Sequence, residues 1–119
     1  MDVQILEKFQ RSLVAFFDEL VEMFPNEEFV YLRIMVKDRI PSTQIIKYFV
    51  KVSMDKEIMG SIERRDENFF LTNVLFSNFS KSDVFKKMWL TLEEDNKDMF
   101  WNWVDAFMKL TENYKKATS

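Results

Sequence analysis

The 119-residue chain contains no histidine and no cysteine. Histidine is the side chain that most often acts as a general base at neutral pH, and it is also the commonest metal ligand. Without these two residue types, Ser-His and Cys-His catalysis and thiolate zinc sites are excluded. The lack of cysteine also excludes a disulfide framework, so nothing points to secretion, and an intracellular or virion-interior setting is expected.

Glycine and proline are almost as scarce, with one glycine and two prolines in the whole chain. Tight hairpins and short β-turns depend on these residues, so an all-β fold would have almost no turn residues to use. A glycine-rich phosphate-binding loop is excluded for the same reason. The remaining possibility is an all-α fold, in which helices are joined by polar loops.

Long apolar runs and a surplus of positive charge are also missing. No uncharged apolar stretch reaches about 18 residues, and acidic Asp2 and Glu7 stand near the N-terminus, so neither a membrane span nor a signal peptide is expected. Residues 1–60 hold eight basic and ten acidic side chains, and residues 61–119 hold nine and ten. Because nucleic-acid binding needs a concentrated cationic face, this balance argues against a nucleic acid as the partner.

Apolar residues make up 47% of the chain and charged residues 31%, which is the balance of a globular domain. In residues 2–24 apolar side chains recur at steps of three and four, the spacing of one helix face. Pro25 should end this helix, because the α conformation is disfavoured before proline. A second helix is expected over residues 27–39 with Asn26 as its N-cap, and a third after the N-cap Ser42.

The second half carries further helical signals. Residues 53–62 favour a helix, although Gly60 weakens its interior by about 1 kcal/mol relative to alanine. A short helix is expected near Asp66, a capping box at residues 80–83 should begin another, and Asn96 should cap the last. The predicted fold is all-α: a single domain over residues 1–119, built as a compact irregular bundle of five to six helices with the first and last in the centre.

Carboxylates are the only remaining candidates for catalysis. The pairs Glu19 with Glu22 and Glu63 with Asp66 match the two-part pattern by which all-α nucleotide pyrophosphohydrolases hold Mg²⁺. Hard cations need several oxygen ligands in one cavity. Glu22 lies about 160° from the apolar stripe of its helix, so a solvated polar face is the favoured interpretation. No catalytic residue, cofactor or metal ligand is therefore expected.

The aromatic content is high, with 13 Phe, 3 Trp and 3 Tyr. Helix periodicity already requires most of these rings in a core. Tyr48 beside Lys47 and Lys51, and Phe85 beside Lys86 and Lys87, are the only aromatics with the basic neighbours that base stacking would need, and both patterns are ordinary in amphipathic helices.

The last helix carries a second apolar ridge. With Trp103 at the centre of the inward face, Val104, Met108 and Trp101 lie at about 100°, 140° and 160° from it. Two interpretations fit this ridge: a neighbouring helix or the Phe-rich segment covers it, or it forms a protein contact surface, where Trp and Met are enriched. The sequence leaves both interpretations open, and the predicted interface consists of Trp101, Val104 and Met108.

Four stretches, FFDELVEMFPNEEF, IIKYFVKV, IERRDENFFL and MWLTLEEDNKDMFWNWVDAF, cover most of the helical pattern. Through them the chain resembles a group of small helical proteins encoded by nucleocytoplasmic large DNA viruses of algae and protists. The resemblance implies a viral protein made in the host cytoplasm and, for some members, packaged in the virion. It implies no activity and no functional residues.

Three functional hypotheses follow. The first is a non-enzymatic structural or protein-interaction module, with a minor virion component as its specific form, whose partner is another protein or a second copy of the chain. The alternative is a Mg²⁺-dependent pyrophosphohydrolase-like enzyme that uses the acidic pairs. A nucleic-acid-associated factor ranks third, because the charge balance argues against it.

Overall fold

The computed structural model describes residues 2–24, 26–71 and 84–118. All regular structure in these ranges is helical, which confirms the all-α prediction. The elements are α1 (Asp2–Met23), α2 (Glu27–Ile34), the π-helical segment η1 (Met35–Arg39), α3 (Ser42–Met54), α4 (Lys56–Glu63), α5 (Asn68–Leu71), α6 (Val84–Thr91) and α7 (Glu94–Thr118). The described residues thus hold seven α-helices instead of the predicted five to six, because short helices at residues 56–63 and 68–71 are separate elements.

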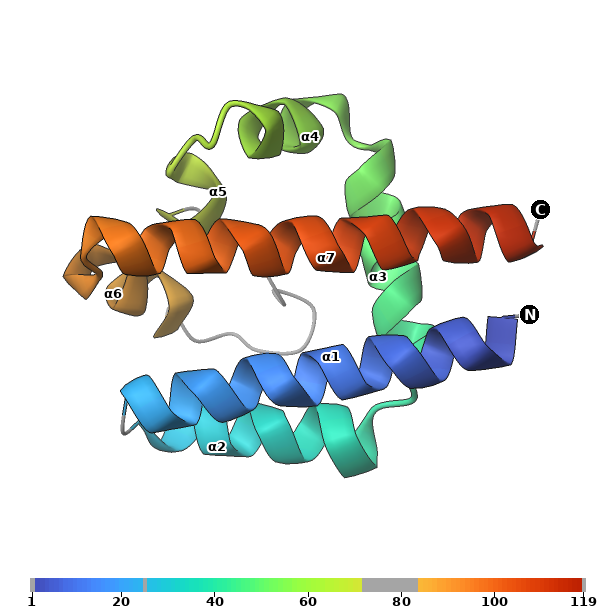
Figure 1. The fold of residues 1–119 in the computed structure, drawn as a ribbon, viewed down its shortest axis with the longest axis horizontal. Coiled ribbons are helices and arrows are strands. Elements are labelled where there is room, and N and C mark those ends of the chain that lie inside the picture. Colours follow the sequence, from blue (N-terminus) through green and yellow to red (C-terminus); the bar gives the residue numbers. More distant parts are fainter. Residues whose placement is uncertain (1, 25, 72–83, 119) are drawn as a thin grey trace.

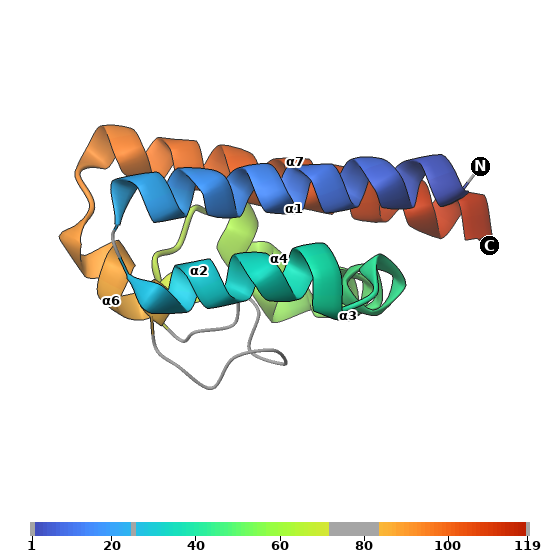
Figure 2. The ribbon, with the colours of Figure 1, turned by 90° about the horizontal axis from the view of Figure 1, so that it is seen from below.

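The two long helices, α1 and α7, lie side by side and antiparallel, so that the ends of the described chain meet at one end of the molecule (Figures 1 and 2). The shorter helices form a second layer, with α2 below α1 and α3 crossing behind α7 in the view of Figure 1. Helix α1 contacts α7, α2, η1 and α3, and α7 also packs against α3. The first and last helices are therefore central, as the breadth of the apolar stripe on the first predicted.

Phenylalanine rings fill the space between the two layers. Phe16 of α1 is buried and lies edge-on to Phe100 and Phe107 of α7, with ring centroids 5.8 and 5.4 Å apart. Phe9, two turns earlier, meets both Phe49 of α3 and Phe107 in the same way. Edge-to-face pairs add about 0.5–1.5 kcal/mol each beyond the burial of their area. The high Phe content thus has a structural explanation in this core.

Two predicted helix starts agree with the structure. The Asn26 side chain accepts a hydrogen bond from the Glu28 amide at 2.8 Å, which confirms it as the N-cap of α2. The short helix expected near Asp66 is α5, and the Asp66 carboxylate accepts from the Asn68 amide at 3.0 Å. In both cases an Asn or Asp oxygen satisfies one of the amides that a helix start leaves without a partner.

Two other predicted caps are wrong. Ser42 is the first residue of α3, after Pro41, and no side chain caps this end. Helix α7 begins at Glu94, two residues before Asn96, and the Glu93 carbonyl accepts from the Asn96 and Lys97 amides at 3.0 and 3.1 Å. Acidic residues in this first turn suit the positive helix end, so the helix starts earlier than Asn96 alone predicted. The capping box at residues 80–83 lies outside the described residues.

The predicted helix over residues 53–62 is interrupted at Asp55. The Asp55 backbone is extended, and its carboxylate accepts hydrogen bonds from the Glu57 and Ile58 amides at 3.0 and 3.1 Å. An N-cap side chain stabilises the start of a new helix at the expense of continuing the old one. The chain turns at this residue, and α4 runs in a different direction from α3 (Figure 1).

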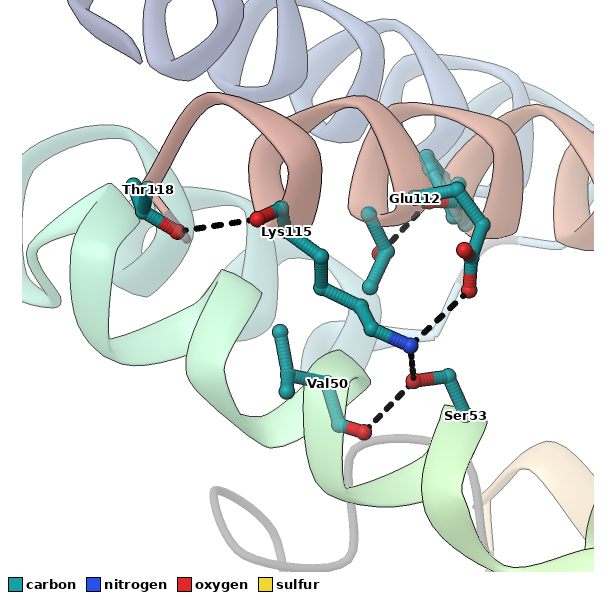
Figure 3. Close-up of polar contacts among 7 residues, drawn as sticks. Val50, Ser53, Glu112, Lys115 and Thr118 are labelled. Carbon is teal, nitrogen blue, oxygen red and sulfur yellow. Dashed lines mark hydrogen bonds and ion pairs between the residues drawn. The ribbon is translucent and has the colours of Figure 1, made fainter.

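Polar contacts hold the last turns of α7 against α3 (Figure 3). The Lys115 ammonium lies 3.4 Å from the Ser53 hydroxyl of α3 and 3.2 Å from the Glu112 carboxylate. The Ser53 hydroxyl donates in turn to the Val50 carbonyl at 2.6 Å, and the Thr118 hydroxyl donates within α7. These contacts tie the end of α7 to α3.

Candidate protein-interaction surface

The predicted interface on α7 lies inside the molecule. Trp101, Val104 and Met108 are only 5%, 2% and 7% exposed. The prediction that they form an exposed contact surface is therefore wrong, and the alternative, that another segment of the chain covers them, is the one observed. The Phe-rich segment supplies that cover, since Phe69 and Phe70 of α5 lie against Trp101 with ring centroids 5.9 and 5.1 Å away.

A third ring completes the cover. Trp89 of α6 stacks on Phe70 at 4.2 Å and meets Trp101 edge-on at 5.8 Å. At the edge of this cluster, Arg65 forms a two-point ion pair with Asp105 of α7, at 2.9 and 2.5 Å. Its guanidinium also lies over the Trp101 ring, 5.3 Å from the centroid. Residues from α5, α6 and the α4–α5 connection thus bury Trp101 of the second ridge.

Lys97 makes a similar contact at the start of α7. Its ammonium pairs with Glu67 at 2.7 Å and lies 5.3 Å from the centre of the Trp89 ring. The hydrogen bond and charge of Lys97 lower the pKa of the Glu67 carboxyl, and the carboxylate raises the pKa of Lys97 in return. The Trp89 indole nitrogen is buried and makes no hydrogen bond of ordinary geometry with the described residues. These groups border the aromatic cluster at the start of α7.

Trp103, expected at the centre of the inward face, is only half-buried. Its ring packs on Phe16 and Phe107, at 5.7 and 5.9 Å, and its indole nitrogen donates to the Glu19 carboxylate at 2.9 Å. The sequence assigned Trp103 to the core and Trp101 to the outside. Trp101 is instead the more deeply buried of the two, because α5 and α6 enclose it, whereas Trp103 packs on the core and stays partly exposed.

The acidic pairs do not form one ligand set. Glu19 accepts from Trp103, Glu22 and Glu63 are exposed, and Asp66 caps α5. Within residues 2–24, 26–71 and 84–118, no three acidic side chains stand close enough to hold a metal ion together. The two aromatics with basic neighbours are not exposed for stacking either, because Tyr48 and Phe85 are buried in the core.

A groove of about 410 Å³ lies between α1 and η1. Its lining combines apolar and charged side chains: Gln10, Arg11, Val14, Ala15 and Asp18 of α1, and Lys37 and Asp38 of η1. Ala15 is the smallest of these side chains and lies at the middle of the α1 row. The groove is open to solvent, and each of its two walls carries one basic and one acidic residue.

Pro41 accounts for the shape of the second wall. Proline has no N–H to donate to the carbonyl four residues earlier, which is that of Lys37. Here the Gln10 side-chain amide donates to the Lys37 carbonyl at 2.9 Å, and the Ile40 amide bonds five residues back to Met35 at 2.7 Å. The π-helical turn thus leaves the Lys37 carbonyl to the Gln10 side chain, and this hydrogen bond links the second wall to α1. Turns of this kind are frequent at functional sites.

Exposed apolar side chains continue from the groove along α2. Val30, Tyr31 and Ile34 are 44%, 55% and 43% exposed, and they make up half of the six large apolar side chains that the described residues leave exposed. Ile34 lies one turn before Lys37, and Val30 one turn before Ile34. We call the groove lining together with Val30 and Ile34 the α1/α2 face. Arg33 pairs with Asp18 across this face and joins its two helices.

One signal of this face is present in the sequence of α2. Helical spacing places Phe29, Leu32, Met35 and Val36 on the inward side, and Val30, Tyr31 and Ile34 are apolar residues outside that stripe. Apolar residues all round a short helix indicate contacts on more than one side. The groove itself had no such signal, since it depends on the π-helical turn and on how α1 packs beside it.

Among the described helices, none combines the length and the apolar character needed to cross a membrane. No family model, curated protein or solved structure matches the chain. The geometry of the α1/α2 face is therefore the basis for a functional assignment.

Proposed function

We propose that this chain is a non-enzymatic protein-interaction module that binds a protein through the α1/α2 face. The observation that carries the proposal is the groove between α1 and η1, continued by exposed Val30 and Ile34. Outside α2, the large apolar side chains that the described residues leave exposed stand singly on three different helices: Val3 on α1, Met54 on α3 and Leu90 on α6. Contiguous apolar side chains left exposed beside a groove and rimmed by charges are typical of protein contact surfaces.

The resemblance to helical proteins of large DNA viruses suggests the setting. As part of the same proposal, the contact forms in the host cytoplasm or in the virion, where the chain acts as a minor structural component. No observation on the described residues favours the hydrolase hypothesis, since its four carboxylates do not form one ligand set.

The test compares two substitutions that add the same charge at different exposed sites. Ile34→Lys places a cation in the α1/α2 face, whereas Leu90→Lys places one on α6, where Leu90 is 67% exposed. Each tagged protein is used to capture partners from cells that express the native chain, and circular dichroism checks that both variants fold. The expected result is a partner that wild type and Leu90→Lys retain and Ile34→Lys loses. Equal capture by all three proteins would contradict the proposal.

A further inference from the structure

We infer that the occupant of the α1/α2 face is a second copy of this chain, in an isologous dimer whose two-fold axis passes between Val14 and Ala15. The inference rests on the proposed function and names its partner. In such a dimer the two copies of α1 cross antiparallel, and each groove faces the other.

The order of charges on α1 carries this inference. Arg11 and Asp18 are seven residues apart, so they lie about 10 Å from each other along the helix and nearly on the same side. Both line the groove, with Val14 and Ala15 midway between them. A two-fold axis at that midpoint brings Arg11 of each copy to Asp18 of the other. A face with opposite charges at equal distances from its centre is complementary to itself, which an isologous interface requires.

The state of these two charges within one chain agrees with an external partner. Arg11 is exposed and has no ion pair with any residue that the structure describes. Asp18 pairs with Arg33 but keeps 54% of its side chain exposed, so it can accept a second cation. The second wall of the groove is also balanced, with Lys37 beside Asp38. A strongly acidic partner would be repelled by the two acidic residues of the groove, and a strongly basic partner by the two basic ones.

The size and chemistry of the centre fit a helix crossing. Ala15 is exposed at the proposed axis, and a small side chain there lets two helix backbones approach closely. Val14, Val30 and Ile34 supply apolar surface around it. Along α1 the face runs from Gln10 to Asp18, about 12 Å, and with α2 beside it the face is about 20 Å wide, which gives an area on the order of 250 Å² per copy. This is below the size of a standard interface, so a weak dimer with a dissociation constant of about 100 µM is expected.

Charge reversal with rescue tests the inference, using sedimentation velocity of the full chain from about 1 µM to about 500 µM. In the dimer, residue 11 of each copy faces residue 18 of the other. Arg11→Glu therefore places two acidic groups against each other at both contacts, and Asp18→Arg places two basic groups against each other at both, so each variant replaces attraction by repulsion. Each single variant should raise the dissociation constant about tenfold or more. The double variant R11E/D18R restores opposite charges at both contacts, so its dissociation constant should return to within about threefold of wild type.

Lys109→Glu is the matched control for the charge change. Lys109 is exposed on α7 and lines a separate hollow of about 160 Å³ between α1 and α7, and it is not part of the α1/α2 face. This variant should dimerise as wild type does. Circular dichroism melting of every variant shows whether the monomer is folded, and loss of the exposed Asp18–Arg33 pair should change its stability little.

The outcomes separate this inference from the proposed function. A wild-type chain that stays monomeric up to the highest concentration overturns the dimer. So does a dimer that Arg11→Glu leaves unchanged, or one that the double variant fails to restore. If the dimer is overturned while Ile34→Lys still loses a captured protein that Leu90→Lys retains, the interaction face stands and its occupant is a different protein. If neither assay shows dependence on the face, both proposals fail.

Discussion

Two apolar ridges of this molecule lie outside the contact between α1 and α7, and they differ in burial. The ridge of Trp101, Val104 and Met108 on α7 is buried, whereas Val30 and Ile34 on α2 stay exposed. Trp101 of the first ridge is covered by Phe69 and Phe70, more than thirty residues earlier in the sequence. No described segment covers the second. A ridge becomes core or contact surface according to whether the rest of the chain can reach it.

The sharpest test of this contrast compares one residue from each ridge. Trp101→Ala should lower the free energy of unfolding by about 3–5 kcal/mol, because it leaves a large cavity among Phe69, Phe70 and Trp89. Ile34→Ala, on an exposed position, should change it by less than about 1 kcal/mol. Guanidinium unfolding followed by circular dichroism measures both values. Similar losses of unfolding free energy for the two variants would mean that both ridges contribute equally to the stability of the monomer.

Trp103 extends the contrast to the neighbouring indole. Trp103→Phe keeps an aromatic ring beside Phe16 and Phe107 but removes the donor to Glu19, so we expect a loss of about 1–2 kcal/mol. If Glu19 is the relevant partner, Glu19→Gln, which retains an acceptor, should cost less. If Trp103→Phe lowered the free energy of unfolding as much as Trp101→Ala does, the expected difference between the two tryptophans would be contradicted.

The cap at Asp55 tests whether the covering segment depends on the break between α3 and α4. Asp55→Ala removes the acceptor for the Glu57 and Ile58 amides and should cost about 1 kcal/mol. Asp55→Asn keeps an acceptor oxygen and should cost much less. Equal losses for the two variants would indicate that the charge matters and the cap does not.

Gly60→Ala should stabilise the same segment. Gly60 is inside α4, where glycine is less favourable than alanine by about 0.8–1 kcal/mol. A Cβ at this position would lie 2.9 Å from the end of the Arg64 side chain, which is exposed and can move. Denaturant unfolding should therefore give a gain of about 0.5–1 kcal/mol. A loss would show that the Arg64 side chain cannot yield.

The smallest expected effect depends on pH and concerns the Glu67–Lys97 pair at the edge of the aromatic cluster. Lys97 lowers the pKa of Glu67, so the pair stabilises the folded state above the ordinary carboxyl pKa of 4.5 and loses this contribution as the pH falls through the lowered value. Glu67→Gln should therefore be less stable than wild type at pH 7. The difference should vanish near pH 2, and a constant difference at both pH values would exclude ionisation as its cause.

Several features of the fold were predictable from local sequence. The stripe on residues 2–24, the Asn26 cap and the short helix after Asp66 depend on neighbours within one or two turns, and the structure agrees with all three. The break at Asp55 was also encoded locally, since aspartate is a strong N-cap. It was missed because the apolar spacing on either side of it is compatible with one continuous helix.

The candidate site was less predictable, because it depends on contacts between distant residues. The sequence by itself determined that the chain is helical, that it lacks histidine and cysteine chemistry, and that two helices carry more apolar surface than one partner helix can cover. Only the tertiary structure decided which surplus became core. Helix periodicity gives the angle of a side chain around its own axis, but burial depends on which other helix lies at that angle. Arg65 reaching Asp105 forty residues away, and Gln10 reaching the Lys37 carbonyl, are contacts that no local pattern specifies.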